Sequence, residues 1–308
     1  MFNKILFATT ASPTCDSAAH VAFDLAKKYN SDLYVYHVLG LPSRGFGHFA
    51  MDARTGETEH VGPDYEAWVI DEINNTYTKQ LAECKTAIVE TLAGVPHTEI
   101  LRKARKENVD LIVMGAHSRE EDKGAMRYRS IVGSTMQKVA KSARCPVLIV
   151  ARPCTTCLWY FSNIIFGTDF SKASDSAFTF AFHMARHIGS KLWIFHAMDM
   201  SSMHAGKIHS QNEIEDKIKE ARKKIDEKYI SKMGDYDNYE VEVWEGIPYV
   251  EILKFAREKN GDLIVMAHHT RDIDPDEALL GSTVEQVVLR SNCPVASVNR
   301  PDHADLNI

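Results

Sequence analysis

The sequence contains two copies of one distinctive passage. The first reads Asp-Leu-Ile-Val-Met-Gly-Ala-His-Ser-Arg over residues 110–119, and the second reads Asp-Leu-Ile-Val-Met-Ala-His-His-Thr-Arg over residues 262–271. Each continues to a Gly-Ser-Thr, at 133–135 and 281–283, and then to a Cys-Pro-Val, at 145–147 and 293–295. A chain that repeats its most distinctive passage in the same order is interpreted as two copies of one structural unit.

The repeat extends over nearly the whole chain, and its offset changes only in loops or helix flanks. Residues 4–10 match 163–169, an offset of 159, residues 94–96 match 246–248, an offset of 152, and Gly133 matches Gly281, an offset of 148. A length of 308 residues suits two domains of about 150 residues each. We expect a first domain over 1–153, a linker over 154–161, a second domain over 162–301 and a tail over 302–308.

Short apolar runs alternate with amphipathic segments in both halves. This alternation predicts an α/β fold, in which a parallel sheet of five strands is covered by helices on both faces. The first half illustrates it, with strands expected at 4–10, 33–37 and 87–92, helices at 16–28 and 65–82, and a long loop over 40–63. The second half repeats the pattern, with strands at 163–169, 192–196 and 239–244 and helices at 175–187 and 213–232.

A ligand crevice is expected where strand order reverses in such a sheet, beyond the carboxyl ends of strands one and four. These ends lie at Thr10 and Gly115 in the first half and at Asp169 and Ala267 in the second. The helix that follows strand four begins at the Gly-Ser-Thr, where free N–H groups and the helix dipole attract an anion. The alternative interpretation is a serine helix cap without a ligand, and Asp169 can equally cap a helix or a turn.

Composition excludes several classes of protein. Hydrophobic residues make up 44% and charged residues 25%, as in ordinary globular proteins. A net charge of −6 provides no broad basic surface for nucleic acid or anionic membrane. No apolar run approaches the roughly 20 residues that span a bilayer, and the N-terminus lacks a signal-peptide layout. Six scattered cysteines do not form a disulfide framework, so we expect a cytoplasmic protein.

From Lys4 to Pro301 the chain resembles the universal stress protein family in its tandem, two-domain form. The passage from Asp110 to Val150 carries the resemblance most clearly. It implies an adenine nucleotide alpha hydrolase-like sheet with strand order 3-2-1-4-5 in each half. It also implies dimerisation through the last strand, which in a tandem chain can join the two halves as an intrachain pseudo-dimer. A further homodimer and an unknown protein partner are expected, with neither nucleic acid nor membrane as partner.

The ATP-binding branch of this family carries Gly, two residues, Gly, nine residues and then Gly-Ser or Gly-Thr, with an Asp that ends strand one. The first half keeps Gly115, but Ser118 replaces the second glycine, 14 residues precede Gly133, and Thr10 replaces the Asp. The second half keeps Asp169, but Ala267 and Thr270 replace both glycines, and ten residues precede Gly281. Neither half has the complete motif.

The charge of the loop between strand four and its helix differs between the halves. Residues 119–130 carry four basic and three acidic side chains, whereas residues 271–279 carry Arg271 and four acidic side chains. A polyphosphate is therefore better tolerated by the first loop, and the second refuses it or accepts it with a divalent cation such as Mg²⁺. Carried onto both halves, the resemblance implies these nucleotide-binding residues: Thr10, Val38, Gly115, His117, Ser118, Arg119, Gly133, Ser134, Thr135, Asp169, Ala197, Ala267, Thr270, Gly281, Ser282 and Thr283.

No catalytic constellation is recognisable, since the Gly-x-Ser-x-Gly, His-Glu-x-x-His and Walker motifs are missing. Cys154 and Cys157 are a weak candidate for zinc or a reversible disulfide, and the alternative is two thiols in a turn. We expect a stress-response protein that binds ATP, AMP or another adenine nucleotide as a sensed ligand. The alternatives are a scaffold that acts through protein contacts without nucleotide, and a weak ATPase.

Overall fold

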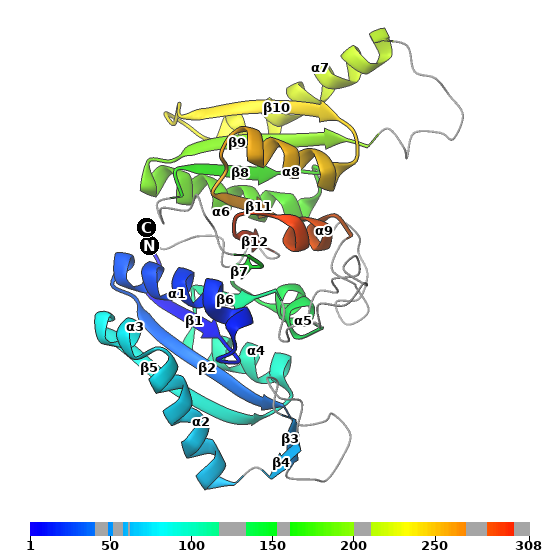
Figure 1. The fold of residues 1–308 in the computed structure, drawn as a ribbon. Coiled ribbons are helices and arrows are strands. Elements are labelled where there is room, and N and C mark those ends of the chain that lie inside the picture. The colour runs from blue at the N-terminus through cyan, green and yellow to red at the C-terminus, as the bar shows by residue number, and fades with distance from the viewer. Residues whose placement is uncertain are drawn as a thin grey trace. The chain divides into compact units, whose positions relative to one another are not determined.

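The computed structural model describes residues 1–40, 49–51, 58–60, 62–116, 134–152, 161–199, 211–268 and 282–298. The chain divides into two compact units, Met1–Pro153 and Cys154–Ile308. Within each unit, strands alternate with helices along the chain (Figure 1). Among the described residues, no helix is both long and apolar enough to cross a bilayer.

The second unit contains one parallel five-stranded sheet. Its order is β10-β9-β8-β11-β12, with every neighbouring pair parallel. The strands are β8 (Asn163–Gly167), β9 (Lys191–Met198), β10 (Tyr239–Glu245), β11 (Leu263–Met266) and β12 (Val295–Ser297). The helices are α6 (Lys172–Ile188), α7 (Gln211–Lys228), α8 (Pro248–Glu258) and α9 (Ser282–Arg290). Numbered within the unit, the order is 3-2-1-4-5, as the family resemblance implied.

The first unit has the same parallel core, in the order β5-β2-β1-β6-β7. The strands are β1 (Lys4–Ala8), β2 (Asp32–Gly40), β5 (Thr86–Gly94), β6 (Leu111–Gly115) and β7 (Val147–Val150). The helices are α1 (Asp16–Tyr29), α2 (Pro63–Thr76), α3 (Thr78–Glu83), α4 (Pro96–Glu107) and α5 (Ser134–Ser142). Helix α1 packs against α3, and α4 against α5, so two helical layers cover the sheet (Figure 1).

The prediction of an uninterrupted loop over 40–63 is wrong in part. This segment contains β3 (Phe49–Met51) and β4 (Thr58–His60), which pair antiparallel with each other. Strand β3 also pairs with the end of β2, where Met51 lies opposite Gly40. Strands of three residues are too short to produce a period-two pattern, so their pairing depends on the neighbouring strand rather than on their own sequence.

The prediction of one continuous helix over 65–82 is also wrong. The segment divides into α2 and α3 at Tyr77, a buried residue with non-helical backbone angles. The Tyr77 ring packs at 5.8 Å from the Phe7 ring and at 5.5 Å from the Phe23 ring. The second unit behaves alike, because α7 ends before the buried Tyr229 instead of continuing to residue 232. Burial of the tyrosine ring therefore outweighs local helix propensity in both units.

An aspartate at the same position of the repeat, buried at Asp262 and half-buried at Asp110, links the first and fourth strands of each unit. The carboxylate of Asp262 accepts hydrogen bonds from the backbone N–H groups of Ser162 at 2.6 Å and Asn163 at 3.1 Å. Asp110 does the same in the first unit, where it accepts from Asn3 at 2.7 Å and Lys4 at 2.9 Å. These bonds satisfy donors at the start of strand one and align it with strand four, so the repeated Asp at the head of the sequence motif has a structural role.

We predict that Asp262→Ala lowers the free energy of unfolding by about 2–3 kcal/mol, because two hydrogen bonds to a charged acceptor are lost and two N–H groups lose their partner. In a unit of this size the midpoint of thermal unfolding should fall by roughly 4–10 °C. The matched control is Asp226→Ala on the exposed side of α7, which should change stability by no more than about 0.5 kcal/mol. Equal effects of the two changes would contradict the structural role of Asp262.

Candidate functional site

A cavity of about 190 Å³ lies at the carboxyl ends of β8 and β11 in the second unit. Its lining combines the ends of three strands with the amino-terminal parts of α6, α8 and α9. The lining residues are Gly167, Thr168, Asp169, Ser174, Phe195, Ala197, Pro248, Ile252, Met266, Ala267, His268, Thr283 and Val284. Strand β8 is joined to β9 on one side and to β11 on the other, so the cavity occupies the point where strand order reverses, the place predicted for a ligand.

The side chain of Asp169 is held in place at the mouth of this cavity. Its Oδ1 accepts hydrogen bonds from the Ser174 hydroxyl at 2.6 Å and from the Ser171 backbone N–H at 2.9 Å. The hydroxyl of Ser171 in turn caps α6 by accepting from the Ser174 N–H. The Asp169 carboxylate therefore does stabilise the turn, as one of its two sequence interpretations required. A carboxylate offers about four acceptor positions, so two are left for a ligand.

The backbone beyond β8 is held in a conformation that residues other than glycine rarely adopt. Phe170 has φ of +65°, in the left-handed region that costs a non-glycine residue about 1–2 kcal/mol. Its N–H donates to the Thr168 hydroxyl at 3.0 Å, and that hydroxyl lies 2.7 Å from the Tyr229 hydroxyl. The Lys228 Nζ donates to the Phe170 carbonyl at 2.6 Å. These contacts compensate for the strain and fix the direction in which Asp169 leaves the strand.

The first unit repeats this arrangement. Ala11 has φ of +52°, and its N–H donates to the Thr9 hydroxyl at 2.9 Å, which lies 2.9 Å from the Tyr77 hydroxyl. His37 Nδ1 lies 2.8 Å from the Thr9 carbonyl, as His196 Nδ1 does from the Thr168 carbonyl. Sequence reasoning missed this threonine, tyrosine and histidine set. The signal was present, because each member recurs at the offset of its part of the repeat.

The two units differ in the side chains that correspond to the cavity. Thr10 corresponds to Asp169, Val38 to Ala197 and Ala8 to Gly167, so the first unit has no carboxylate at the end of strand one and carries larger side chains around it. A Cβ on Gly167 would lie 2.6 Å from Cδ1 of Ile252. The glycine therefore allows α8 to pack closely on the floor of the cavity.

The remaining predicted site residues fall into three groups. Asp169, Ala197, Ala267 and Thr283 come together around the cavity, beside Ser282, the first residue of α9. Thr10, Val38, Gly115, Ser134 and Thr135 lie at the corresponding strand ends and helix start of the first unit, where the Thr10 hydroxyl lies 2.7 Å from the Ser12 hydroxyl. The other predicted residues lie outside the described part of the chain, namely His117, Ser118, Arg119, Gly133, Cys154, Cys157, Thr270 and Gly281. Within the described part of the chain, no group of three or more His, Cys, Asp or Glu side chains could hold a metal ion.

Burial lowers the pKa of His196 beside the cavity. Removal from water is the main cause, the nearby Lys224 ammonium acts in the same direction, and the Thr168 carbonyl and Asp169 carboxylate oppose it. The ring also packs against Phe170, with centroids 4.4 Å apart. The folded protein therefore favours the neutral imidazole.

We predict that His196→Gln reduces the loss of stability on acidification. Because the folded-state pKa lies below the unfolded value, the unfolded chain takes up the proton first as the pH falls below about 6.5, and stability falls with it. The variant should lose the part of the pH dependence of stability that His196 contributes. A part should remain, because burial and Lys138 also lower the pKa of His97. The measurement is the unfolding midpoint between about pH 8 and pH 5. An unchanged pH profile would contradict the assignment, and His187→Gln at an exposed position is the control.

Comparison with known proteins gives one consistent result. The model of the universal stress protein family matches residues 1–151 and again 161–299. A universal stress protein of Methanocaldococcus jannaschii is 29% identical over 160 residues, which cover 50% of this chain and 84% of that protein. The universal stress protein YxiE of Bacillus subtilis is 32% identical over 163 residues, which cover 49% of this chain and 99% of that protein.

A solved structure shares the fold over both units. The crystal structure of a universal stress protein from Archaeoglobus fulgidus superposes with a TM-score of 0.63 and 23% identity, covering 97% of each chain. The duplicated sequence matches single-domain relatives one half at a time and this longer relative as a whole. The chain belongs to the universal stress protein family, in a tandem form with two domains of that family.

Proposed function

We propose that the second unit binds an adenine nucleotide, ATP or AMP, as a sensed ligand in a cytoplasmic stress response. The observation that carries the proposal is the cavity at the point of strand reversal, with the Asp169 carboxylate fixed at its mouth. Membership of the family supports a stress-response role. The base would lie at the ends of β8 and β9 and the phosphates at the start of α9, as the sequence predicted for this half of the chain.

The shape of the cavity suits the base better than the whole nucleotide. Apolar side chains form part of its lining, namely Phe195, Ile252, Met266 and Val284. A volume of about 190 Å³ is below the 300–1,000 Å³ of typical pockets for larger ligands, so it accommodates a flat ring while the rest of the ligand extends outward. The Asp169 carboxylate would accept a hydrogen bond from the exocyclic amino group of adenine, because it has acceptor positions left and the amino group is a donor.

The phosphates would lie at the start of α9. Thr283 in its first turn lines the cavity, and the first turn of a helix presents N–H groups and a positive dipole end to an anion. The acidic side chains in residues 271–279 oppose a bare polyphosphate, so ATP would bind there as its Mg²⁺ complex. AMP, with a smaller charge, requires no such cation.

We place the nucleotide in the second unit, whereas the charge of the loop after strand four favoured the first. Residues 119–130, whose basic side chains favoured the first half, lie outside the described residues. The first unit has Thr10 in place of the carboxylate and Val38 in place of the small Ala197. Both differences favour the second unit as the base-binding site.

A sensed ligand suits this site better than a substrate. Among the described lining residues Asp169 is the one carboxylate, and one of its oxygens already accepts two hydrogen bonds. In the proposed complex the remaining acceptor positions face the adenine amino group, so this carboxylate would not take a proton from an attacking water. Bound nucleotide should therefore be recovered without turnover.

We expect purified protein to release an adenine nucleotide on denaturation, or to be stabilised by ATP with Mg²⁺ or by AMP. At a ligand concentration a hundred times Kd, binding contributes about 2.7 kcal/mol, which raises the unfolding midpoint by roughly 5–10 °C. The ligand should leave the incubated protein unhydrolysed. Absence of both retained nucleotide and any shift at millimolar concentrations would favour a scaffold that works through protein contacts.

Two matched variants locate the site. Ala197→Leu fills the cavity at its rim and should abolish the shift, whereas Val38→Leu at the corresponding position of the first unit should leave it unchanged. Both positions are half-buried near the ends of equivalent strands, and both variants place the same leucine side chain there, although Ala197→Leu adds three carbons and Val38→Leu adds one. The opposite pattern would move the site to the first unit.

A further inference from the structure

The two units differ in how they protect the outer edge of their sheets. Strand β10 is the edge strand of the second unit, and β5 occupies the equivalent position in the first. An exposed edge presents backbone N–H and C=O groups that can pair with another chain, and proteins commonly block it with charged side chains. The two edges can be compared residue by residue, because β5 and β10 match at an offset of 152.

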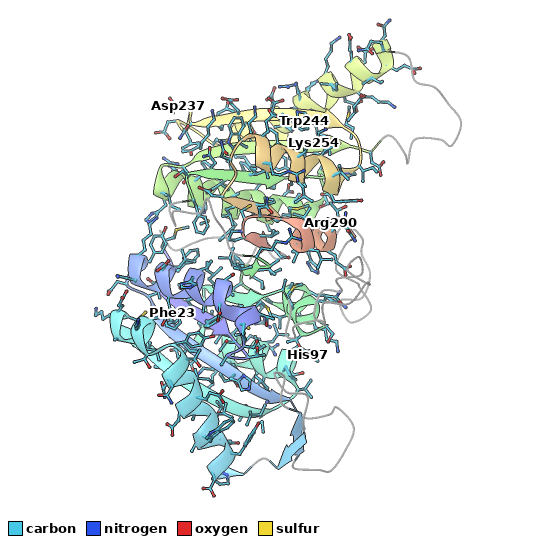
Figure 2. The ribbon with its side chains drawn as sticks, in the orientation of Figure 1. Phe23, His97, Asp237, Trp244, Lys254 and Arg290 are labelled. Atoms are coloured by element: carbon cyan, nitrogen blue, oxygen red, sulfur yellow. The ribbon has the colours of Figure 1, made fainter. Side chains whose placement is uncertain are left out.

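Strand β10 is blocked in three ways. Its edge carries the carboxylates of Glu240, Glu242 and Glu245. The guanidinium of Arg222 on α7 donates to the Val241 carbonyl at 3.1 Å, which occupies a backbone acceptor. Lys254 lies over the Trp244 ring, 5.6 Å from its centroid, and Figure 2 shows these two side chains together.

Strand β5 keeps one of these carboxylates, Glu90 at the position of Glu242, and lacks the other devices. Ile88 stands where β10 has Glu240, Ala93 replaces Glu245, and Ile70 on α2 replaces the guanidinium of Arg222. The strand runs for nine residues without proline, and Glu90 is its one charged residue. Within the described residues, no strand pairs with its outer side.

Exposed apolar side chains are concentrated at the same edge. Among the described residues, four large hydrophobic side chains are exposed, and three of them belong to β5 or to α2, which packs on it. Ile88 is 40% exposed, Leu92 is 42% exposed, and Trp68 on α2 is 49% exposed. The fourth, Ile247, follows β10 in the second unit.

We propose that β5 is an interface between two copies of this chain, which pair their β5 strands antiparallel across a two-fold axis. The proposal is independent of the nucleotide site. Pairing of this kind adds one copy's edge strand to the other's sheet, so the backbone provides the contact and the side chains select the register.

The backbone pattern fixes which residues can bond across the axis. In the second unit Leu192 N–H donates to the Asn238 carbonyl and Gly246 N–H to the Met198 carbonyl, so even-numbered residues of this segment bond to β9. The first unit has the same register, since Leu33 lies opposite Ala87 as Leu192 lies opposite Tyr239. Residues 87, 89, 91 and 93 therefore direct their N–H and C=O groups outward, toward a second copy.

One register uses all of these groups and matches the side chains. With Glu90 on the two-fold axis, Val89 lies opposite Thr91 of the second copy, and Ala87 opposite Ala93, as hydrogen-bonded pairs. Ile88 then lies opposite Leu92 of the second copy in a closely spaced pair, which buries both exposed side chains.

Charge is balanced at the axis. The two Glu90 carboxylates would approach each other, but each is paired with its own Lys103, whose Nζ lies 2.7 Å from Glu90 Oε2. Lys103 is itself almost fully buried and is further held by Glu107 at 3.1 Å. Each Glu90 carboxylate at the axis thus has an ammonium group beside it, which reduces the repulsion between the like charges.

The first test is the mass of the full chain in solution. Sedimentation velocity over a range of concentrations should show a dimer, and Ile88→Glu, which installs the residue found in β10, should raise the dissociation constant at least about tenfold. Ile247→Glu removes an exposed apolar residue elsewhere and should leave the dimer intact. A monomeric wild type at high micromolar concentration would overturn the proposal, as would equal effects of the two variants.

The second test measures the register. Residue 90 opposes its own copy at a Cα separation of about 4.5 Å, within reach of a disulfide, whereas residues 88 of the two copies are displaced by four positions, or about 13 Å. Under mild oxidation Glu90→Cys should form an intermolecular disulfide at position 90, identified by peptide mass spectrometry, and Ile88→Cys should not. Equal crosslinking of the two variants, or none in Glu90→Cys, would contradict this pairing.

Discussion

The pairing of strand one with parallel neighbours on both sides is the constraint on which each unit depends. Strand β8 is bonded to β9 and β11, and helices cover both faces, so all its side chains except the first are buried. A strand in this position cannot leave its end groups unsatisfied. At its amino end Asp262 accepts the backbone donors, and at its carboxyl end the Thr168 hydroxyl accepts the next free one. Asp169 lies between Thr168 and Phe170, so the hydrogen bond at the carboxyl end of the strand also fixes the position of this site residue.

The duplication makes each unit a control for the other. The threonine, tyrosine and histidine set recurs in both, so it maintains the fold of the strand end and does not define a ligand. What differs is the residue that follows the threonine, Thr10 in one unit and Asp169 in the other, together with the size of the nearby side chains. Structural and functional roles can thus be separated at neighbouring positions.

The same comparison separates the two sheet edges. Strand β10 is protected by carboxylates and by the Arg222 guanidinium on a backbone carbonyl, whereas β5 carries Ile88 and Leu92. The two units share one fold, and an exposed strand edge can pair with another chain in either of them. The edge of the second unit is nevertheless protected and that of the first is not. The open edge is therefore assigned to binding, and the self-matching register of β5 assigns it to a second copy.

Sequence alone determined the duplication and the parallel α/β fold, because these depend on patterns that are repeated over many residues, whereas the strand order was implied by the resemblance to the family. It also located the crevice, since in such a sheet the strand ends of Asp169 and Ala267 must lie together. Tertiary structure alone decided the break at Tyr77, the pairing of β3 with the end of β2, and the hydrogen bonds that hold Asp169. The break at Tyr77 depends on ring contacts with Phe7 and Phe23, which are far away in the chain, and their energies exceed the local preferences that a sequence pattern records. The bonds to Asp169 come from the nearby Ser171 and Ser174, and the backbone conformation of the turn decides that they form.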